Sequence, residues 1–360
     1  MALSIAVLTI WIYLLAARGR FWRMREERCE SALNSAARIV AVIPARNEAD
    51  VVGAAVESLA KQRFAGELHI VVVDDHSDDG TAVRARAAVP SGMLSVISAS
   101  PLQAEWSGKL WAVAEGVRFA ARFDPDYLLL TDADIVHGAD TLAKLAARVE
   151  SGYDLASYMA TLRCESLAER ALIPAFVFFF FMLYPPAWGT GAAGGCMLIR
   201  REMLERIGGI ARIRGEWIDD CALAREVRQH DGRVWLGLSR ETRSIRAYGS
   251  FAEIGRMISR SAFTQLRHSV WLLIGTVLGL LLTYAAAPML ALSGSWWGAA
   301  AWALMALLYA PALRFYRVSL LWAPLLPLIA LFYLGATVHS AVMHWRGRGG
   351  LWKGRVRASI

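Results

Sequence analysis

The run Tyr127–Asp134, YLLLTDAD, decides the fold, because four apolar residues are followed, after one threonine, by the triplet Asp-Ala-Asp. Short, continuous apolar runs are typical of strands in a parallel sheet that is covered on both faces. In such sheets, ligands bind beyond the carboxyl ends of the strands. Asp132 and Asp134 therefore stand where ligand-binding side chains are expected.

Two further apolar runs precede this one, and helical patterns separate all three. The runs are Arg38–Ile43 (RIVAVI) and His69–Val73 (HIVVV), and the helical patterns cover Ala49–Gln62, Thr81–Ala88 and Lys109–Arg122. Strands that alternate with helices form right-handed βαβ units, which build a doubly wound sheet. We therefore predict an α/β fold with a Rossmann-like, mostly parallel sheet and helices on both faces.

The triplet Asp132-Ala133-Asp134 carries the most chemistry in the chain. Two carboxylates one residue apart cannot both be buried as bare charges. A divalent cation resolves the conflict, since Mg²⁺ and Mn²⁺ prefer oxygen ligands and share them with substrate phosphates. The alternative is a solvated turn with a helix cap, and the position after an apolar strand favours the metal site.

Acidic residues also follow the other two strands. One carboxylate of Asp74-Asp75 is expected to accept a hydrogen bond from a nucleobase or ribose. Glu48 is either a ribose contact or a plain residue of a helical first turn. Asp78, Asp79 and Thr81 are predicted to be turn and N-cap residues.

Lys109 follows Trp106-Ser107-Gly108 at the start of a predicted helix. A lysine at a helix N-terminus opposes the macrodipole, so an anionic partner such as a phosphate is expected beside it. The alternative is a solvated surface lysine. The second acidic pair, Asp219-Asp220, precedes a helix predicted over Cys221–Gln229. One of the two suffices as a cap, and the other is available as a general base toward a hydroxyl.

The stretch Gly189–Gly194 (GTGAAG) matches a dinucleotide-binding fingerprint in its letters. No strand precedes it, however, and the run that follows Gly195 is typical of a strand and not of a helix. Its small residues are predicted instead to let a substrate approach the backbone closely.

Both ends of the chain are apolar enough for membrane helices. Residues 2–17 are uncharged and are followed by arginines, which favours a retained anchor whose C-terminal side is cytoplasmic. Stretches near 270–292, 296–313 and 318–343 each approach the roughly 20 residues that cross a bilayer. Two C-terminal crossings leave the basic tail inside, whereas three place it outside.

A fourth apolar stretch, 171–188, interrupts the α/β pattern. We predict a helix in the plane of the membrane interface, with a plain core helix as the alternative. Arg256 and Arg260 lie four residues apart on a helix predicted over Phe251–Arg267. They either reach the membrane interface or hold a departing diphosphate. The predicted domains are an N-terminal transmembrane anchor (1–20), a cytoplasmic α/β domain (38–268), membrane helices (269–343) and a basic tail (344–360).

The net charge of +8 belongs almost entirely to the C-terminal membrane region. Residues 269–360 hold no acidic residue and seven basic ones, which leaves +8 − 7, or +1, for residues 1–268. A basic, apolar tail does not form a groove that follows a phosphate backbone, so nucleic-acid binding is excluded. The seven are Arg314, Arg317, Arg346, Arg348, Lys353, Arg355 and Arg357.

Six motifs together resemble the family 2 glycosyltransferases, which have a GT-A fold. In chain order they are IPARNE (43–48), VVDDHSDDGT (72–81), SGK (107–109), TDAD (131–134), GGCMLIRREML (194–204) and WIDDCAL (217–223). The motifs fall within residues 38–267. The runs WSGKLW, GTGAAGGCMLIRR and SFAEIGRMISRSAFTQLRHS resemble, more narrowly, the hopanoid-biosynthesis-associated glycosyltransferases.

The resemblance implies a role for individual residues. By the resemblance, Asp220 is the catalytic base, Asp134 binds the metal, Asp132 contacts the ribose or diphosphate, and the nucleoside contacts are Ala45, Glu48 and Asp75. The residue patterns described above add, as expected substrate-binding residues, Lys109, Gly194, Gly195, Asp219, Arg256 and Arg260. Two positions depart from the family pattern. The acidic pair is Asp219-Asp220 where Glu-Asp is usual, and Ser261 stands where a Gln/Arg-x-x-Arg-Trp motif has its tryptophan. The second departure argues for a single transfer and against processive polymerisation.

The resemblance therefore implies an inverting, metal-dependent glycosyltransferase, multi-pass in a bacterial inner membrane. The expected donor is a nucleotide-diphosphate sugar, with UDP as the expected nucleotide, and the expected acceptor is a lipid hydroxyl, on a hopanoid. Alternatives are a ceramide-like or polyprenyl-phosphate acceptor, or a non-catalytic membrane scaffold. A transporter is disfavoured because the C-terminal membrane block has no carboxylate or lysine for an ion path.

Overall fold

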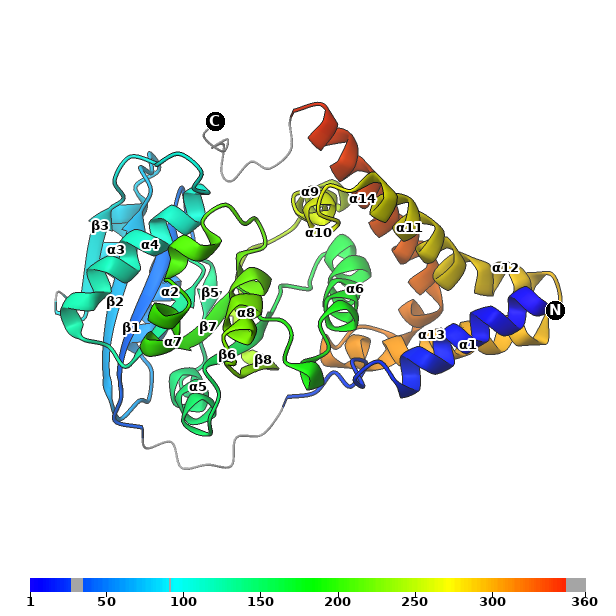
Figure 1. The fold of residues 1–360 in the computed structure, drawn as a ribbon, viewed down its shortest axis with the longest axis horizontal. Coiled ribbons are helices and arrows are strands. Elements are labelled where there is room, and N and C mark those ends of the chain that lie inside the picture. The colour runs from blue at the N-terminus through cyan, green and yellow to red at the C-terminus, as the bar shows by residue number, and fades with distance from the viewer. Residues whose placement is uncertain (27–34, 91, 348–360) are drawn as a thin grey trace. The chain divides into compact units, whose positions relative to one another are not determined.

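The computed structural model describes residues 1–26, 35–90 and 92–347, and its chain divides into two compact units (Figure 1). The helical unit contains Met1–Arg25, Arg163–Trp188 and Ala247–Gly350. The sheet unit contains Glu26–Leu162 and Gly189–Arg246. Segments 163–188 and 247–268, which we assigned to the α/β domain, thus group with the helices. Most of the predicted basic tail, 348–360, lies outside the described residues.

The sheet unit is built on a mixed sheet whose strand order is β3-β2-β1-β4-β7-β6-β8-β5. β3, β2, β1 and β4 are parallel neighbours, as the apolar runs predict. β7 is antiparallel to both β4 and β6, β8 is parallel to β6, and β5 is antiparallel to β8. The strands are β1 (Arg38–Ala45), β2 (Glu67–Asp74), β3 (Leu94–Ser98), β4 (Tyr127–Thr131), β5 (Ile135–Val136), β6 (Leu155–Thr161), β7 (Cys196–Arg200) and β8 (Val234–Ser244).

Helices cover both faces of this sheet, because its strands alternate between two apolar cores. In β1, Val40 and Val42 join the core beneath α4, α7 and α8, while Ile39 and Ala41 join the core beneath α2, α3 and α5. This is the period-2 pattern of a strand buried on both sides. The helices are α2 (Val52–Ala60), α3 (Thr81–Ala88), α4 (Gly108–Ala120), α5 (Thr141–Glu150), α7 (Arg201–Arg206) and α8 (Asp219–Gln229).

The helical unit contains long apolar helices. Four of its helical segments are long and apolar enough to cross a membrane: Leu167–Trp188, Val270–Leu292, Trp296–Phe315 and Leu320–Trp345. The N-terminal helix is shorter, and its 15 residues span about 22 Å against the roughly 30 Å of a bilayer core. The helices are α1 (Ala2–Ala16), α6 (Leu167–Leu183), α9 (Phe251–Ser259), α10 (Ala262–Gln265), α11 (Val270–Leu280), α12 (Ala286–Leu292), α13 (Trp296–Phe315) and α14 (Leu326–Trp345).

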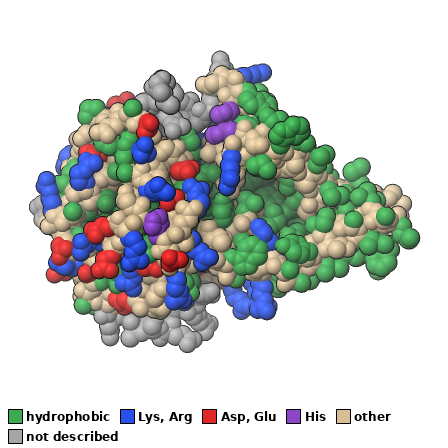
Figure 2. Space-filling view, viewed as in Figure 1, with side chains coloured by type: hydrophobic (Ala, Val, Ile, Leu, Met, Phe, Trp, Pro, Cys, Tyr) green, Lys and Arg blue, Asp and Glu red, His purple; other side chains and the backbone are tan. Residues whose placement is uncertain are grey.

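The surfaces of the two units differ in chemistry (Figure 2). Charged side chains gather over the sheet unit, whereas hydrophobic side chains cover most of the visible surface of the helical unit. Trp271, Leu292 and Leu321 on the helical unit are each more than four-fifths exposed. An apolar surface of this kind is stable in contact with lipid and costly in water. The helices therefore indicate membrane association.

The helix predicted over Phe251–Arg267 is wrong, because α9 ends at Ser259 and α10 begins only at Ala262. Ser340 of α14 causes the break. Its hydroxyl donates to the Ser259 carbonyl and accepts from the Phe263 N–H, two groups that would bond each other in a continuous helix. A side chain inserted into the backbone ladder is a recognised cause of helix breaks.

The phenylalanine-rich helix α6 packs inside the helical unit. The Phe178 ring centroid lies 5.4 Å from that of Tyr309 on α13, and the Phe179 centroid lies 4.9 Å from that of Tyr333 on α14. The Tyr333 hydroxyl also donates to the Leu172 carbonyl at 2.9 Å. These contacts fix α6 among its neighbours, and its predicted orientation in the membrane plane stays a prediction.

Candidate active site

The loops that follow β1 and β2 hold each other at the carboxyl end of the sheet. Three backbone N–H groups of the first loop donate to side chains of the second. Asp79 lies in the turn before α3, as predicted, whereas Gly80 takes the N-cap position and Thr81 is the first residue of the helix. The bonds run from Asn47 to Ser77 Oγ (3.0 Å), from Glu48 to Thr81 Oγ1 (2.8 Å) and from Ala49 to Asp79 Oδ2 (2.9 Å).

Ala45 and Asp75 are both fully buried where these loops begin. The Asp75 N–H donates to the Ala45 carbonyl at 2.8 Å, and the Arg46 Nη1 lies 3.6 Å from Asp75 Oδ2. Arg46 also donates to the Asp75 carbonyl oxygen. Any contact between the Asp75 carboxylate and a ligand therefore requires neighbouring side chains to move, and the nucleoside role of both residues stays a prediction.

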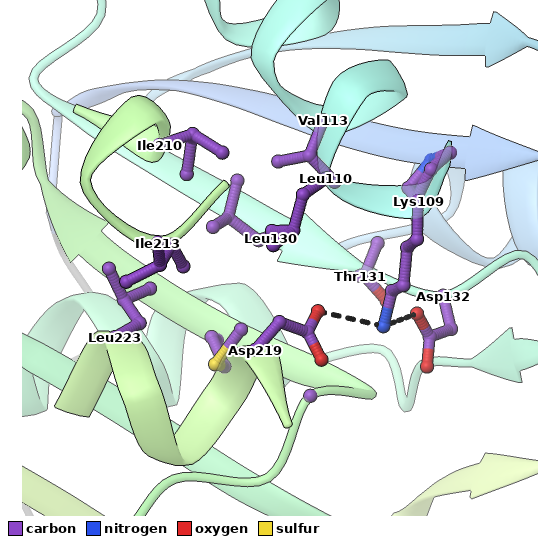
Figure 3. Close-up of a pocket in the computed structure, with 13 residues that line it drawn as sticks. Lys109, Leu110, Val113, Leu130, Thr131, Asp132, Ile210, Ile213, Asp219 and Leu223 are labelled. Carbon is purple, nitrogen blue, oxygen red and sulfur yellow. Dashed lines mark ion pairs between the residues drawn. The ribbon is translucent and has the colours of Figure 1, made fainter. Parts of the chain in front are cut away.

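Lys109 joins two acidic residues from different elements (Figure 3). Its Nζ lies 2.8 Å from Asp132 Oδ1, at the end of β4, and 3.1 Å from Asp219 Oδ2, at the start of α8. The two carboxylates raise the pKa of Lys109 despite its burial, so the ammonium stays charged. The anionic partner expected beside this lysine is thus found, in the form of carboxylates.

Asp220 lies next to this triad in the first turn of α8. Its Oδ2 accepts from the Gly194 N–H and its Oδ1 from the Cys221 N–H, both at 2.7 Å. Burial, followed by the nearby charge of Asp219, raises the pKa of Asp220 to about 6. A carboxylate with this pKa is well suited to accept a proton near neutral pH.

The glycines of the GTGAAGG run make room for this arrangement. A Cβ at Gly194 would lie 3.3 Å from Asp220 Oδ2, and one at Gly195 would lie 3.1 Å from Ile135 Cδ1. The close approach to the Gly194 backbone is therefore made by Asp220 itself. The run begins no helix, since β7 follows it, which agrees with the rejection of a dinucleotide fingerprint.

Asp134 is held on the other side of the β4 end. Its Oδ2 accepts from the Ser244 hydroxyl at 2.5 Å and lies 3.4 Å from Arg246 Nε. The Arg246 Nη2 in turn donates to both carboxylate oxygens of Glu48, at 2.7 and 2.8 Å. Glu48, predicted to contact a ribose, is therefore part of an ion-paired cluster in the structure.

The acidic residues fit a divalent metal only together with a further ligand. Across residues 1–26, 35–90 and 92–347, no three His, Cys, Asp or Glu side chains form a metal-binding group. Mg²⁺ and Mn²⁺ are commonly held by one or two carboxylates plus substrate phosphates. Asp134 supplies ligand oxygens of the right chemistry, and a diphosphate would have to complete the shell.

A pocket adjoins the Lys109 triad (Figure 3). Its polar edge is formed by Lys109, Asp132 and Asp219, and Gly194 also borders it. Its remaining wall is largely apolar and comes from α4, β4, β7 and α8 with the turn before it. The apolar lining includes Leu110, Val113, Leu130, Met197, Ile210, Ile213 and Leu223.

A buried hydrogen-bond network supports the end of β4 from behind. The Thr131 hydroxyl donates to the Gly195 carbonyl at 2.7 Å and lies 3.1 Å from His137 Nε2. Burial lowers the pKa of His137 to about 3, so the imidazole is neutral. The network joins the strand that carries Asp132 to the glycine run that binds Asp220.

Comparison with known proteins finds a similarity in the segment that carries Lys109, Asp132 and Asp134. Residues 40–208 match the model of the family described as "Glycosyl transferase family 2". The matched segment covers just under half of the chain and is similar to that family. A comparison with curated proteins found no match.

Solved structures resemble the chain at low sequence identity. The mannosyltransferase PcManGT from Pyrobaculum calidifontis, in complex with GDP-Man and Mn²⁺, is 18% identical, with a TM-score of 0.58 over 94% of this chain and 98% of that one. Glucosyl-3-phosphoglycerate synthase from Mycobacterium tuberculosis, in complex with Mn²⁺, UDP and glucosyl-3-phosphoglycerate, is also 18% identical. Its TM-score is 0.46, over 68% of this chain and 86% of that one. The likeness to PcManGT confirms the predicted GT-A type of fold.

The sheet unit gathers most of the predicted residues around the end of β4 and the start of α8. Lys109, Asp132 and Asp219 share one triad, Asp220 binds Gly194 beside it, and Asp134 pairs with the end of β8. Arg256 and Arg260 belong to the helical unit, and Arg260 directly follows the end of α9. Their role toward a diphosphate stays a prediction.

Sequence reasoning missed the basic and hydroxyl partners of the acidic residues. Arg46 stands beside Asp75, and Ser244 and Arg246 stand beside Asp134. The sequence does contain a signal for Ser244 and Arg246. The apolar run Val234–Leu238 starts β8, and ligand-binding polar residues are expected where such a strand ends. His137 gave no signal, because a single histidine after a strand is common.

Proposed function

We propose that the protein is an inverting glycosyltransferase that moves a sugar from a nucleotide-diphosphate sugar to a hydroxyl of a membrane lipid in a single transfer. Asp220 is the observation that carries the proposal. Its carboxylate is fixed by two backbone N–H groups, and its pKa of about 6 leaves it ionised yet basic at neutral pH.

In the proposed reaction, Asp220 accepts the proton of the acceptor hydroxyl while that oxygen attacks the anomeric carbon. The bond from this carbon to the diphosphate breaks on the opposite face, which inverts the configuration. Lys109 keeps its positive charge and stabilises negative charge that develops on the diphosphate. A divalent cation held by Asp134 would supply further positive charge for the same leaving group.

The helical unit supports a lipid acceptor. Its four long apolar helices indicate that the protein resides at a membrane, where a lipid hydroxyl is available. Within the lipids, the resemblance of the WSGKLW and GTGAAGGCMLIRR runs favours a hopanoid with polyol hydroxyls. A ceramide-like or polyprenyl-phosphate acceptor is the alternative, and UDP is the proposed donor nucleotide.

The proposal is tested by Asp220→Asn in the full-length protein, purified in detergent. We expect sugar transfer to be lost while nucleotide binding persists, because the amide cannot accept the proton but still fills the same space. Transfer is measured with labelled UDP- and GDP-sugars against hopanoid, ceramide and polyprenyl-phosphate acceptors, and binding by titration calorimetry with UDP and GDP. Asp124→Asn is the matched control, since Asp124 is exposed and pairs with the surface residues Arg38 and Arg201.

The outcomes separate the alternatives. Normal turnover by Asp220→Asn would contradict the assignment of the base. Transfer to one lipid class by the unchanged protein identifies the acceptor. Absence of both nucleotide binding and transfer, with a folded protein, would favour a non-catalytic membrane scaffold.

A further inference from the structure

Three consecutive residues at the end of β8 hold Asp134. The Ile245 N–H donates to the Asp134 carbonyl at 2.9 Å, and the Ser244 hydroxyl donates to Oδ2 at 2.5 Å. Arg246 Nε lies 3.4 Å from the same Oδ2. The carboxylate proposed to bind a metal is therefore already engaged by a hydroxyl donor and a positive charge of the chain itself.

Arg246 is anchored in this position by Glu48. Its Nη2 lies 2.7 and 2.8 Å from the two oxygens of that carboxylate, which leaves Nε facing Asp134. The side chains of Arg246, Glu48 and Asp134 are 31%, 12% and 14% exposed, so water screens their charges only partly. A guanidinium does not lose its proton in proteins, and its charge is permanent here.

We infer that the guanidinium of Arg246 competes with a divalent metal ion for the Asp134 carboxylate. Binding of the metal therefore depends on the diphosphate of the donor. The inference rests on the metal role of Asp134 in the proposed function. A divalent ion that approaches Asp134 without donor is repelled by the guanidinium. It also finds no group of three His, Cys, Asp or Glu ligands among the described residues.

The donor changes both the repulsion of the metal ion by Arg246 and the number of ligands available to the metal. Its diphosphate brings negative charge that offsets the repulsion and oxygen atoms that complete the metal's coordination shell. Metal and nucleotide must then raise each other's affinity by the same factor, because the coupling between two ligands is reciprocal. Arg246 strengthens this coupling by weakening the binding of metal alone.

The same arrangement occurs on the other acid of the triplet. Lys109 lies between Asp132 and Asp219, as Arg246 lies between Asp134 and Glu48. Each carboxylate of the Asp132-Ala133-Asp134 triplet is thus bridged by a basic side chain to a second acid. Of these two basic side chains, Arg246 is the one that pairs with the predicted metal ligand, which makes it the residue to test.

The test measures Mn²⁺ affinity by electron paramagnetic resonance of free Mn²⁺, on full-length protein in detergent and without any turnover. Arg246→Gln should bind Mn²⁺ about tenfold or more tightly than the unchanged protein when no nucleotide is present, a factor equal to about 1.4 kcal/mol. With saturating UDP or GDP, the gain in Mn²⁺ affinity due to nucleotide should be smaller in Arg246→Gln than in the unchanged protein.

Four variants control this result. Arg243→Gln removes an exposed arginine of the same strand and should leave Mn²⁺ affinity unchanged. Arg246→Lys keeps the charge and should stay near the unchanged protein. Ser244→Ala removes the hydroxyl that donates to Asp134 and accepts from the Arg246 N–H, and it should raise nucleotide-free affinity by a smaller factor. Asp134→Ala should abolish the site.

The outcomes are distinguishable. Equal or weaker nucleotide-free Mn²⁺ binding by Arg246→Gln would overturn the inference and leave the proposed function standing. No Mn²⁺ binding by the unchanged protein, even with UDP or GDP, would contradict the metal role of Asp134 and the inference together. If Arg246→Gln does not fold, Ser244→Ala decides, and an affinity unchanged by that substitution counts against the inference.

Discussion

Asp220 has two neighbours that act on its proton affinity in opposite directions. Burial and the charge of Asp219 raise its pKa to about 6, while Lys109 and the two backbone N–H groups that it binds oppose the rise. The raised pKa of Asp220 therefore comes first from its own burial and second from the charge of Asp219. A carboxylate with an ordinary pKa would be a weaker base for a hydroxyl proton.

Because the base must be ionised, we expect kcat/KM to rise with pH through about 6 and to level off above it. The logarithm should rise with a slope of about one below that pH, as for a single ionisation. The measurement is the pH profile of kcat/KM for transfer by the full-length protein. Asp219→Asn removes the neighbouring negative charge and should move the step to lower pH. A profile that stays flat from pH 5 to 8 would contradict the role of Asp220.

The raised pKa of Asp220 also makes the free energy of unfolding depend on pH. Between about pH 4 and 6 the folded protein holds a proton on Asp220 that the unfolded chain has lost. The contribution of Asp220 to the free energy of unfolding therefore falls as pH rises through this window. Asp220→Asn should remove that contribution. The difference between this variant and the unchanged protein therefore separates the titration of Asp220 from that of the other carboxylates.

At the scale of elements, α4 packs very close to the sheet. Its position matters because its first turns provide Lys109 and part of the pocket wall. A Cβ at Gly116 of α4 would lie 2.4 Å from Val42 Cγ1 and 2.8 Å from Val73 Cγ2. Both contacts involve buried, stiff valines of β1 and β2, so the helix would have to move away from the sheet.

We expect Gly116→Ala to destabilise the protein by about 1–2 kcal/mol, because overpacking outweighs the gain of about 1 kcal/mol in helix propensity. The measurement is the midpoint of thermal unfolding in detergent, followed by tryptophan fluorescence. Gly53→Ala in α2 is the matched control, since its added Cβ would meet only a carbonyl at 3.9 Å. The control should be neutral or slightly stabilising, and equal midpoints for the two variants would refute the argument.

The elements that sequence could predict are those whose signal is local. The strands β1, β2 and β4 and the acids after them follow from apolar runs, and the start of α4 follows from Ser107 and Gly108. The break after Ser259 could not be predicted, since its cause is Ser340, 81 residues away along the chain. Arg246 was missed for the same reason, because its partner Glu48 is 198 residues away.

At the scale of the whole molecule, the distribution of charge separates two chemistries. The acids of the site lie in the sheet unit, whereas no Asp or Glu occurs after Glu253. The orientation is indicated by the five arginines between residues 18 and 28, which follow the N-terminal apolar run and place that side in the cytoplasm by the positive-inside rule. The sequence predicts from this rule that the α/β domain is cytoplasmic.

This orientation predicts which positions react with a thiol reagent that cannot cross membranes. Lys61→Cys, on an exposed part of the sheet unit, should be labelled only after cells are opened. Ser293→Cys, in the exposed turn between α12 and α13, should be labelled in intact spheroplasts, because one crossing of the apolar segment Val270–Leu292 takes the chain to the outer side. The unchanged protein gives the background from its own thiols. Labelling of Lys61→Cys in intact spheroplasts, with Ser293→Cys protected, would require the opposite orientation. That result would remove access of the α/β domain to cytoplasmic nucleotide sugars.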